Sequence, residues 1–481
     1  MLRNDEIALL APVRANLYQH QLSAVNFVCD LFGVFDRRIR SRGAALLMEM
    51  GCGKSLAAIT VAGFQYQFGQ VKRALIVAPL SILGVWEEEF RKFADFPYQL
   101  TILKGSTEKK RAQLRSLQAG GLGVVAVNYE SAWRLEKELL SYDADLIIAD
   151  EGHKLKEART AQSKCMHHLG DRAGFRMLLT GTLITGKELD VFSQYRFVNS
   201  DIFGTSFYAF RNRYFDMTGY GFHVPVFRSC LREEFLRKMH SVAFRVTKKE
   251  CLDLPETVEE IRPVELEPKA MRLYEQIEKD SFAQLAKSEV SAVNILTKLV
   301  RLSQLTGGHV TDDDGRTNAV SQAKLSALED IIDAAVQEGS KLVIMARFVP
   351  ELDDIQALLE KKKISYVVIR GGVRDRTDAV KRFQTDSDCR IFVGQIAAAG
   401  LGITLTAAST MIFYSLDYSM SNFDQAKARI HRVGQKETCH YIYLIAKGTV
   451  DEKVLRSLRN KIDLAKLLVD DYRKGQNPFQ A

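Results

Sequence analysis

The sequence predicts an α/β protein with two parallel-sheet lobes, helical insertions and a closing helix near its C-terminus. Short apolar runs without polar alternation recur at helix-length spacing, as expected of strands buried on both faces of a parallel sheet. The runs also fall into two series, separated by a segment of different character. The first series comprises Ala44 to Met48, Ala74 to Ala78, Val124 to Asn128, Leu146 to Ala149 and Met177 to Thr180, and the second comprises Leu342 to Met345, Tyr366 to Ile369, Ile391 to Val393, Met411 to Tyr414 and Tyr441 to Ile445.

Composition places the chain among ordinary globular proteins. Of its 481 residues, 46% are hydrophobic and 26% are charged, and the net charge is +8. The seven cysteines are far apart and form no C-x-x-C pair, so neither a disulfide framework nor a zinc site is indicated, and we expect a reducing compartment. No apolar run reaches about 18 residues, so we expect no membrane span and a cytoplasmic protein. The positive charge fits a polyanionic partner, although a solvated surface gives the same total.

A glycine-rich turn after the first apolar run predicts a phosphate-binding loop. Gly51 and Gly53 lack the Cβ atoms that would keep backbone N–H groups away from a polyphosphate, and a helix beginning at Lys54 directs its positive dipole end at the same anion. Lys54 would reach the outer phosphates, and the hydroxyl of Ser55 would ligate magnesium. Met48 stands where the strict G-x-x-x-x-G-K-[ST] motif has its first glycine, so a chance glycine-rich helix start is the alternative.

A pair of acidic residues follows another apolar run. Asp150 and Glu151 come directly after residues 145–149, at the end where an α/β sheet places its ligands. Asp150 would hold a magnesium ion that bridges the phosphates, and Glu151 would orient and deprotonate the attacking water. An isolated Asp-Glu pair is usually a solvated turn, but together with the Lys54 loop in the same sheet it predicts a hydrolytic site.

A basic segment in the second lobe supplies candidate partners for the γ-phosphate. Gln425, Arg429 and Arg432 stand at positions i, i+4 and i+7, which would place them on one face of a helix. Two guanidinium groups could hold phosphoryl oxygens as charge develops there, as an arginine finger does. A surface helix with scattered cations is the alternative. Because the lysine and the acids would come from one lobe and the arginines from the other, the site would be complete only when the lobes close.

The pattern along the chain suggests four regions. We expect an N-terminal lobe over residues 1–200, a helical protrusion and linker over 201–320, a C-terminal lobe over 321–447, and a closing helix with a tail over 448–481. Basic and aromatic residues interleave over 205–250, which indicates either a nucleic-acid surface or, as we favour, a small helical subdomain with an aromatic core. The turn-rich segment 306–315 is the best candidate hinge.

Eight motifs occur in a fixed order along the chain. They are Leu17 to Gln21, Met48 to Ser55, Val77 to Ser81 followed by Trp86 to Phe90, Asn128 to Ser131, Asp150 to His153, Leu178 to Thr182, Gly400 to Leu405 and Gln425 to Gln435. In this order they resemble the motifs of a Swi/Snf-type ATPase of helicase superfamily two. The segment Arg429 to Gln435, followed by Gly448 to Glu452, separates this family from ordinary unwinding helicases. The resemblance covers nearly the whole chain.

The resemblance implies two RecA-like lobes, ATP and Mg²⁺ as cofactors, DNA-stimulated ATP hydrolysis, and movement along double-stranded or branched DNA. It also implies roles for individual residues. The catalytic residues would be Lys54, Asp150, Glu151, Arg429 and Arg432, and the metal would be bound by Ser55 and Asp150. The nucleotide would be bound by Gln21, Met50, Gly51, Cys52, Gly53, Lys54, Ser55, Leu56 and Gly402, with Gln21 contacting the adenine. His153, Thr180, Thr182 and Gln425 would couple the nucleotide state to DNA. The DNA track would consist of Pro79, Ser81, Asn128, Tyr129, Arg347 and Thr404, and its contacts would fall mainly on phosphate.

Three positions depart from the family pattern, since Gly152 replaces the usual alanine, Leu183 the usual proline and Gly186 a common asparagine. None removes a catalytic group, although together they put the shape of the cleft-facing loop in doubt. We expect no chromodomain-like or bromodomain-like region beside the motor. We therefore expect a short form like those of bacteria or phages, monomeric when free, acting in the cytoplasm of a bacterial or phage-infected cell, with an unknown protein recruiter.

Three functions fit this resemblance. The first is a double-stranded DNA translocase that displaces bound proteins or remodels branched DNA. The second is a strand-separating helicase, against which the tail after Arg432 argues. The third is an ATP-gated DNA clamp with little turnover, for which Leu183 is the only support.

Overall fold

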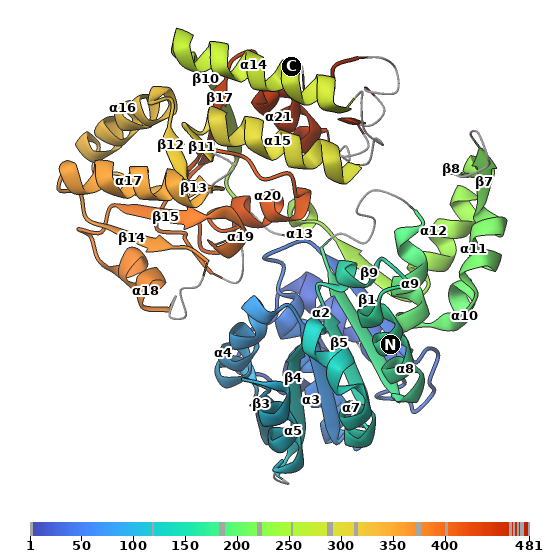
Figure 1. Cartoon of the computed structure of the whole chain (residues 1–481). Coiled ribbons are helices and arrows are strands. Elements are labelled where there is room, and N and C mark those ends of the chain that lie inside the picture. The colour runs from blue at the N-terminus through green and yellow to red at the C-terminus, as the bar shows by residue number, and fades with distance from the viewer. Residues whose placement is uncertain are drawn as a thin grey trace. The chain divides into compact units, whose positions relative to one another are not determined.

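The computed structural model describes residues 3–117, 120–181, 188–218, 224–251, 254–285, 292–311, 316–371, 377–399, 403–460, 464, 467–468, 471 and 476–479. The chain divides into two compact units, Met1–Asp253 and Leu254–Ala481, each built around its own sheet (Figure 1). Every described pairing between neighbouring strands of the two large sheets is parallel. The predicted fold class, two α/β lobes with parallel sheets, is therefore confirmed.

The first unit has a seven-stranded sheet in the order β3-β4-β2-β5-β6-β1-β9. Its strands are β1 (Gly43–Met48), β2 (Arg73–Ala78), β3 (Tyr98–Ile102), β4 (Leu122–Asn128), β5 (Leu146–Asp150), β6 (Phe175–Thr180) and β9 (Ala243–Val246). Its helices are α1 (Asn4–Leu10), α2 (Gln19–Leu31), α3 (Lys54–Gln67), α4 (Leu83–Phe93), α5 (Thr107–Arg115), α6 (Tyr129–Ala132), α7 (Glu136–Tyr142), α8 (Ala161–Arg172), α9 (Asp190–Val198), α10 (Ser200–Phe203), α11 (Phe207–Tyr214), α12 (Arg232–His240) and α13 (Lys248–Cys251). A hairpin of β7 (Phe215–Thr218) and β8 (Val224–Phe227) projects beside α11 and α12 (Figure 1).

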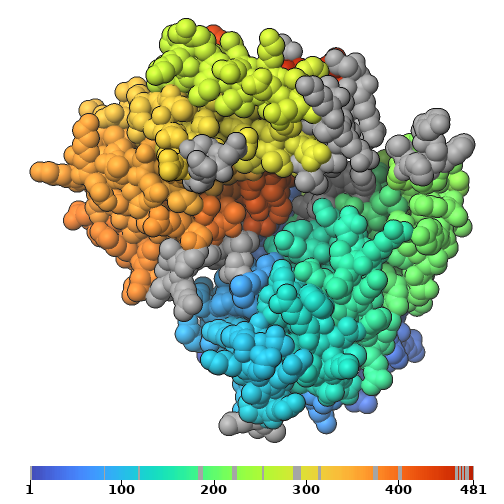
Figure 2. Space-filling model, in the orientation of Figure 1, coloured from blue at the N-terminus to red at the C-terminus, as the bar shows by residue number. Residues whose placement is uncertain are grey.

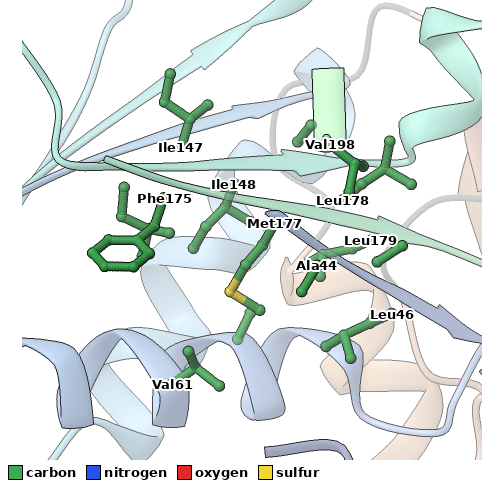
Figure 3. Packing of buried hydrophobic residues seen from close by; sticks show 14 of the residues in the cluster. Ala44, Leu46, Val61, Ile147, Ile148, Phe175, Met177, Leu178, Leu179 and Val198 are labelled. Atoms are coloured by element: carbon green, nitrogen blue, oxygen red, sulfur yellow. The ribbon is translucent and has the colours of Figure 1, made fainter. Parts of the chain in front are cut away.

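The core of this unit lies between the sheet and the helices on its faces. Ile148 and Met177 point from neighbouring strands toward α3, whereas Ile147 points to the opposite face (Figure 3). All three side chains are buried. Burial on both faces explains why the strand sequences lack polar alternation.

The register of the first sheet brings the predicted site segments to one edge. Leu47 pairs with Thr180, and Asp150 pairs with Leu179. The phosphate loop after β1, the end of β6 and the acidic pair after β5 therefore stand side by side at the carboxyl end of the strands, where α/β sheets bind ligands.

The segment after α9 forms a helical protrusion with an aromatic core, the interpretation that we favour for residues 205–250. The ring of Phe203 lies 5.1 Å from that of Phe235 and 5.3 Å from that of Phe210. Phe192 of α9 joins the cluster at 5.2 Å from Phe210. These rings pack against one another and are buried, so they do not form a nucleic-acid surface.

The second unit has a six-stranded sheet in the order β10-β17-β16-β13-β15-β14. Its strands are β10 (Thr257–Val264), β13 (Leu342–Ala346), β14 (Tyr366–Ile369), β15 (Ile391–Gln395), β16 (Thr410–Phe413) and β17 (Cys439–Ala446), beside a hairpin of β11 (His309–Thr311) and β12 (Thr317–Ala319). Its helices are α14 (Pro268–Leu285), α15 (Ala292–Thr306), α16 (Ala323–Gln337), α17 (Val349–Lys361), α18 (Thr377–Thr385), α19 (Ile396–Ala399), α20 (Met420–Lys427) and α21 (Val450–Arg459). Helices α14 and α15 pack together and form the yellow-green surface of this unit (Figure 2).

Two predictions about the organisation of the chain need correction. The predicted hinge at 306–315 lies inside the second unit, and the break between units falls between Asp253 and Leu254. The hinge segment is packed, because a Cβ atom on Gly307 would stand 2.0 Å from Oε1 of Glu351; residues 312–315 lie outside the described part of the chain. The expected region 201–320 is divided as well, since β9 belongs to the first sheet and β10 to the second.

The closing helix corresponds to α21, which contacts α15 and β17 within the second unit. Its apolar residues Val454, Leu455 and Leu458 are buried there. Among the described residues, no helix combines the length and the apolar character needed to cross a membrane.

Candidate functional site

The phosphate loop has the backbone that its glycines predict. Gly51 and Gly53 have φ angles of 88° and 79°, in the left-handed region that favours glycine. At Gly53 a Cβ atom would also stand 2.0 Å from Nε2 of Gln21, so a larger residue there would displace the amide of Gln21. Helix α3 begins at Lys54, directly after Gly53, so its first backbone N–H groups lie next to the loop.

Lys54 folds over its own loop. Its Nζ donates to the carbonyl oxygen of Met48 at 2.9 Å and lies 3.5 Å from that of Glu49. A phosphate group would attract the ammonium more strongly than these neutral carbonyls, because its oxygens carry negative charge. The loop therefore holds the lysine beside the space where an anion would bind.

Two side chains of α2 contact the phosphate loop. Nε2 of Gln21 donates to the carbonyl of Cys52 at 3.3 Å, and Nε2 of His20 lies 2.9 Å from the same oxygen. Oε1 of Gln21 accepts from the backbone of Tyr18, and the residue is 4% exposed. Gln21 thus lies at the loop, and its predicted contact with adenine stays a prediction. His20 was not predicted, since a contact to a backbone carbonyl leaves no sequence signal.

Asp150 is the most heavily constrained acid of the site. One carboxylate oxygen accepts from the indole Nε1 of Trp86 at 3.0 Å, the other from the backbone N–H of Glu151 at 2.8 Å. Burial raises the pKa of Asp150 above its ordinary value, the charge of Glu151 raises it further, and the charge of Lys54 lowers it. Strands β1, β6 and β5 are neighbours, so the loop that carries Lys54 and the acid at the end of β5 lie at the same edge of the sheet.

Glu151 adopts a backbone conformation that non-glycine residues rarely take. Its φ angle of 51° lies in the left-handed region, and such strain clusters at functional sites. Oε2 of Glu151 lies 3.2 Å from Nδ1 of His153, and both side chains are mostly buried. His153, a predicted coupling residue, is therefore in direct contact with the predicted base.

The donor set of this edge fits magnesium. Among the residues that the structure describes, no group of three or more His, Cys, Asp or Glu side chains could hold a metal ion by itself. Mg²⁺ usually takes one or two protein oxygens and fills its remaining positions with phosphate oxygens and water. The hydroxyl of Ser55 and the carboxylate of Asp150 supply such oxygens, beside the phosphate loop.

The geometry of the predicted arginines differs from the expected helix face. Helix α20 ends at Lys427, so Arg429 and Arg432 lie beyond the helix that carries Gln425. Beyond the helix, the carbonyl of Arg429 accepts a hydrogen bond from the backbone N–H of Leu405 at 3.0 Å. The two guanidinium groups nevertheless converge.

The common acceptor of both arginines is the carbonyl of Ile403, at 3.1 Å from Nη1 of Arg429 and 3.2 Å from Nη1 of Arg432. Arg429 is buried and also donates from Nε to the carbonyl of Gln425 at 2.9 Å, whereas Arg432 is partly exposed. Gln425 is buried. The predicted residues Gly402 and Thr182, and the departures Leu183 and Gly186, lie outside the described residues.

The predicted DNA-track residues differ in exposure and in contacts. Pro79 precedes the 3₁₀ turn η1 (Leu80–Ile82), of which Leu80 is 69% exposed, and Ser81 lies within that turn. Thr404 is partly buried, and Cζ of Arg347 lies 3.6 Å from the ring centroid of Tyr418. Asn128 is buried, and its Nδ2 donates to Oε2 of Glu130 at 2.6 Å.

Tyr129 requires a correction, because its side chain is 1% exposed. Its hydroxyl donates to the backbone carbonyl of Asp150 at 2.8 Å. The tyrosine therefore contacts the acidic pair rather than a surface that DNA could reach. Its neighbour in sequence, Asn128, is also buried, at 6% exposed, and its predicted contact with DNA stays a prediction.

Comparison with known proteins identifies the family. Residues 20–307 match the family described as "SNF2-related domain", and residues 323–434 match the "Helicase conserved C-terminal domain". The chain belongs to the SNF2-related family. The predicted resemblance is thus confirmed, and this SNF2-related chain is a DNA-dependent ATPase of the helicase class.

Individual relatives resemble the SNF2-related chain over most of its length. A "DNA repair and recombination protein RAD54-like" of Gallus gallus is 27% identical over 96% of this chain and 69% of its own, and a "Chromodomain-helicase-DNA-binding protein 1-like" of Mus musculus is 28% identical over 94% of this chain and 50% of its own. The chain thus spans from one half to about two thirds of these relatives. A solved "Sulfolobus solfataricus SWI2/SNF2 ATPase core in complex with dsDNA" is 25% identical, covers 97% of this chain and 95% of its own, and has a TM-score of 0.47.

Proposed function

We propose that this SNF2-related ATPase moves along double-stranded DNA and uses the energy of ATP hydrolysis to displace bound proteins or remodel branched DNA. The observation that carries the proposal is the grouping of Lys54, Asp150 and Glu151 at one edge of the first sheet. The name of the chicken relative refers to DNA repair and recombination, which supports DNA as the substrate.

Each residue of this edge has a step to perform. Lys54 would leave the loop carbonyls and bind the outer phosphates, while the backbone N–H groups of Gly53 and of the first turn of α3 bind the phosphate oxygens. Glu151 would take the proton of the attacking water, and His153 would hold the carboxylate of Glu151 in place. Mg²⁺, held by Ser55 and Asp150, would neutralise charge that develops on the phosphates.

For the two arginines of the second unit we keep the predicted role at the γ-phosphate. Arg429 is buried and held by two backbone carbonyls, so we assign it the role of orienting the segment. Arg432 is more exposed and is the better candidate for direct contact with the phosphate. Replacement of Arg432 by alanine should lower turnover by about 10³-fold. Lys436→Ala removes an exposed cation four residues further on and serves as the matched control.

The decisive test compares steady-state ATP hydrolysis with and without duplex plasmid. A translocase should hydrolyse ATP faster with duplex, and Glu151→Gln should bind ATP yet abolish turnover. The same protein should displace the third strand of a DNA triplex and leave a forked duplex paired. Separation of the fork would support a strand-separating helicase instead, and hydrolysis that duplex does not stimulate would contradict the proposal.

A further inference from the structure

Asp150 is held by two side chains that come from two different segments of the first unit. The indole N–H of Trp86, on α4, donates to Oδ2 of Asp150 at 3.0 Å. The hydroxyl of Tyr129, the first residue of α6, donates to the backbone carbonyl of the same aspartate at 2.8 Å. Trp86 and Tyr129 are each 1% exposed. Both donors therefore lie away from solvent, where a hydrogen bond restrains its partners more strongly than at the surface.

Both segments start at one place on the sheet. Helix α4 follows the turn of Pro79 and η1 after β2, and α6 follows Asn128 at the end of β4. Strands β2 and β4 are neighbours, and their last residues, Ala78 and Asn128, pair directly. Pro79, Ser81 and Asn128, the first-unit part of the proposed DNA track, stand in the turn after β2 and at the end of β4. Leu80 of that turn is 69% exposed, whereas Asn128 is 6% exposed.

We propose that Trp86 and Tyr129 are positioning residues that transmit DNA occupancy at the ends of β2 and β4 to the magnesium ligand Asp150. This inference rests on the proposed function, since it assumes that DNA stimulates hydrolysis. DNA bound at the turn after β2 restrains the start of α4, and Trp86 lies on the first turn of that helix. The same DNA restrains the start of α6 at Tyr129. Fixing both donors fixes the side chain and the backbone of Asp150 together, and so orders the metal site.

Conservative variants isolate the two hydrogen bonds. Trp86→Phe removes the indole N–H, and Tyr129→Phe removes the hydroxyl, while each keeps an aromatic ring in the core. The chain offers a control for each. Trp133 is 39% exposed, and Tyr142 donates its hydroxyl to the backbone carbonyl of Gly123 at 2.9 Å in the same sheet. Trp133→Phe and Tyr142→Phe therefore lose the same atoms away from Asp150.

The first readout is the dependence of hydrolysis on Mg²⁺ and on duplex plasmid. Trp86→Phe should raise the Mg²⁺ concentration for half-maximal activity by about tenfold or more, the factor that matches loss of one hydrogen bond to a charged group. Both Trp86→Phe and Tyr129→Phe should lower the ratio of DNA-stimulated to unstimulated turnover. The two controls should keep the wild-type ratio and the wild-type Mg²⁺ dependence.

The second readout needs no turnover. The chain has two tryptophans, so Trp133→Phe leaves Trp86 as the sole tryptophan, whose emission is read with excitation at wavelengths that tyrosine does not absorb. Duplex DNA added without nucleotide should change the fluorescence of Trp86 in that variant, and adding Tyr129→Phe should reduce the change.

If the fluorescence of Trp86 does not change when duplex DNA is added, the inference is overturned. It is also overturned if Trp86→Phe and Tyr129→Phe both keep the wild-type ratio of DNA-stimulated to unstimulated turnover. In either case stimulation of the wild-type protein would leave the proposed function standing. If duplex fails to stimulate the wild-type protein, the proposed function itself fails and the inference fails with it.

Discussion

Replacement of Lys324 by methionine should destabilise the second unit strongly, because the lysine forms a buried ion pair. Nζ of Lys324 lies 2.5 Å from Oδ2 of Asp451 and also donates to the carbonyl of Tyr414 at 3.2 Å. The other oxygen of Asp451 accepts from the hydroxyl of Thr306 at 2.8 Å. The side chains of Lys324 and Asp451 are 1% and 9% exposed. The pair joins α16, α21 and the end of α15.

The magnitude follows from what the substitution leaves behind. Methionine fills similar space but leaves the carboxylate of Asp451 buried without its counter-charge, which costs about 3 to 5 kcal/mol in proteins. For a unit of this size, 1 kcal/mol shifts the melting temperature by about 2 to 4 °C. The melting temperature of the second unit should therefore fall by about 10 °C.

Differential scanning calorimetry measures this shift, and the transition of the first unit serves as an internal reference. The matched control is Lys447→Met, because Lys447 pairs with Glu265 at 3.4 Å on the surface, where such pairs contribute little. The double variant Lys324→Met with Asp451→Leu should lose less stability than the sum of the two single variants. A loss below about 1 kcal/mol for Lys324→Met, or strict additivity in the double variant, would refute the reasoning.

Three further predictions concern single positions. Gly152→Ala, which restores the residue usual in the family, should displace the loop that carries Asp150 and Glu151, because the new Cβ would stand 2.4 Å from Cγ of Leu178. An ATPase assay should show lower turnover, and adding Leu178→Ala should recover activity. Burial raises the pKa of Glu351 from 4.5 to about 7, so the folded state favours the protonated carboxyl. This group therefore contributes fully to the free energy of unfolding below pH 4.5, and the contribution is lost as pH rises through 7. In urea melts, the difference in unfolding free energy between wild type and Glu351→Gln should change by roughly 3 kcal/mol across that window, and a constant difference would contradict the assignment. Burial raises the pKa of Cys52 to about 12, so iodoacetamide at pH 8 should spare Cys52 and modify the exposed Cys230, as measured by peptide mass spectrometry.

The inner strands could be predicted from the sequence, whereas three of the four edge strands of the described large sheets, β3, β9 and β10, could not. The fourth edge strand, β14, matches the predicted run Tyr366 to Ile369. Strands β1, β2, β5 and β6 are buried on both faces, so nearly every position must be apolar. Strand β3 is half-buried along its length, and β10 is exposed over most of its length. Edge positions tolerate polar residues such as Glu259 and Glu260, and this tolerance removes the apolar run on which the prediction depends.

The sequence by itself determined the fold class, the family and the positions of Lys54, Asp150 and Glu151. Those features follow from local patterns: apolar runs, two glycines that must take positive φ angles, and acids that directly follow a strand. Only the tertiary structure decided that Arg429 and Arg432 converge on Ile403 from outside a helix, and that Trp86 and Tyr129 hold Asp150. These contacts join residues 21 to 64 positions apart, and such pairings depend on how whole elements pack, which no local pattern encodes.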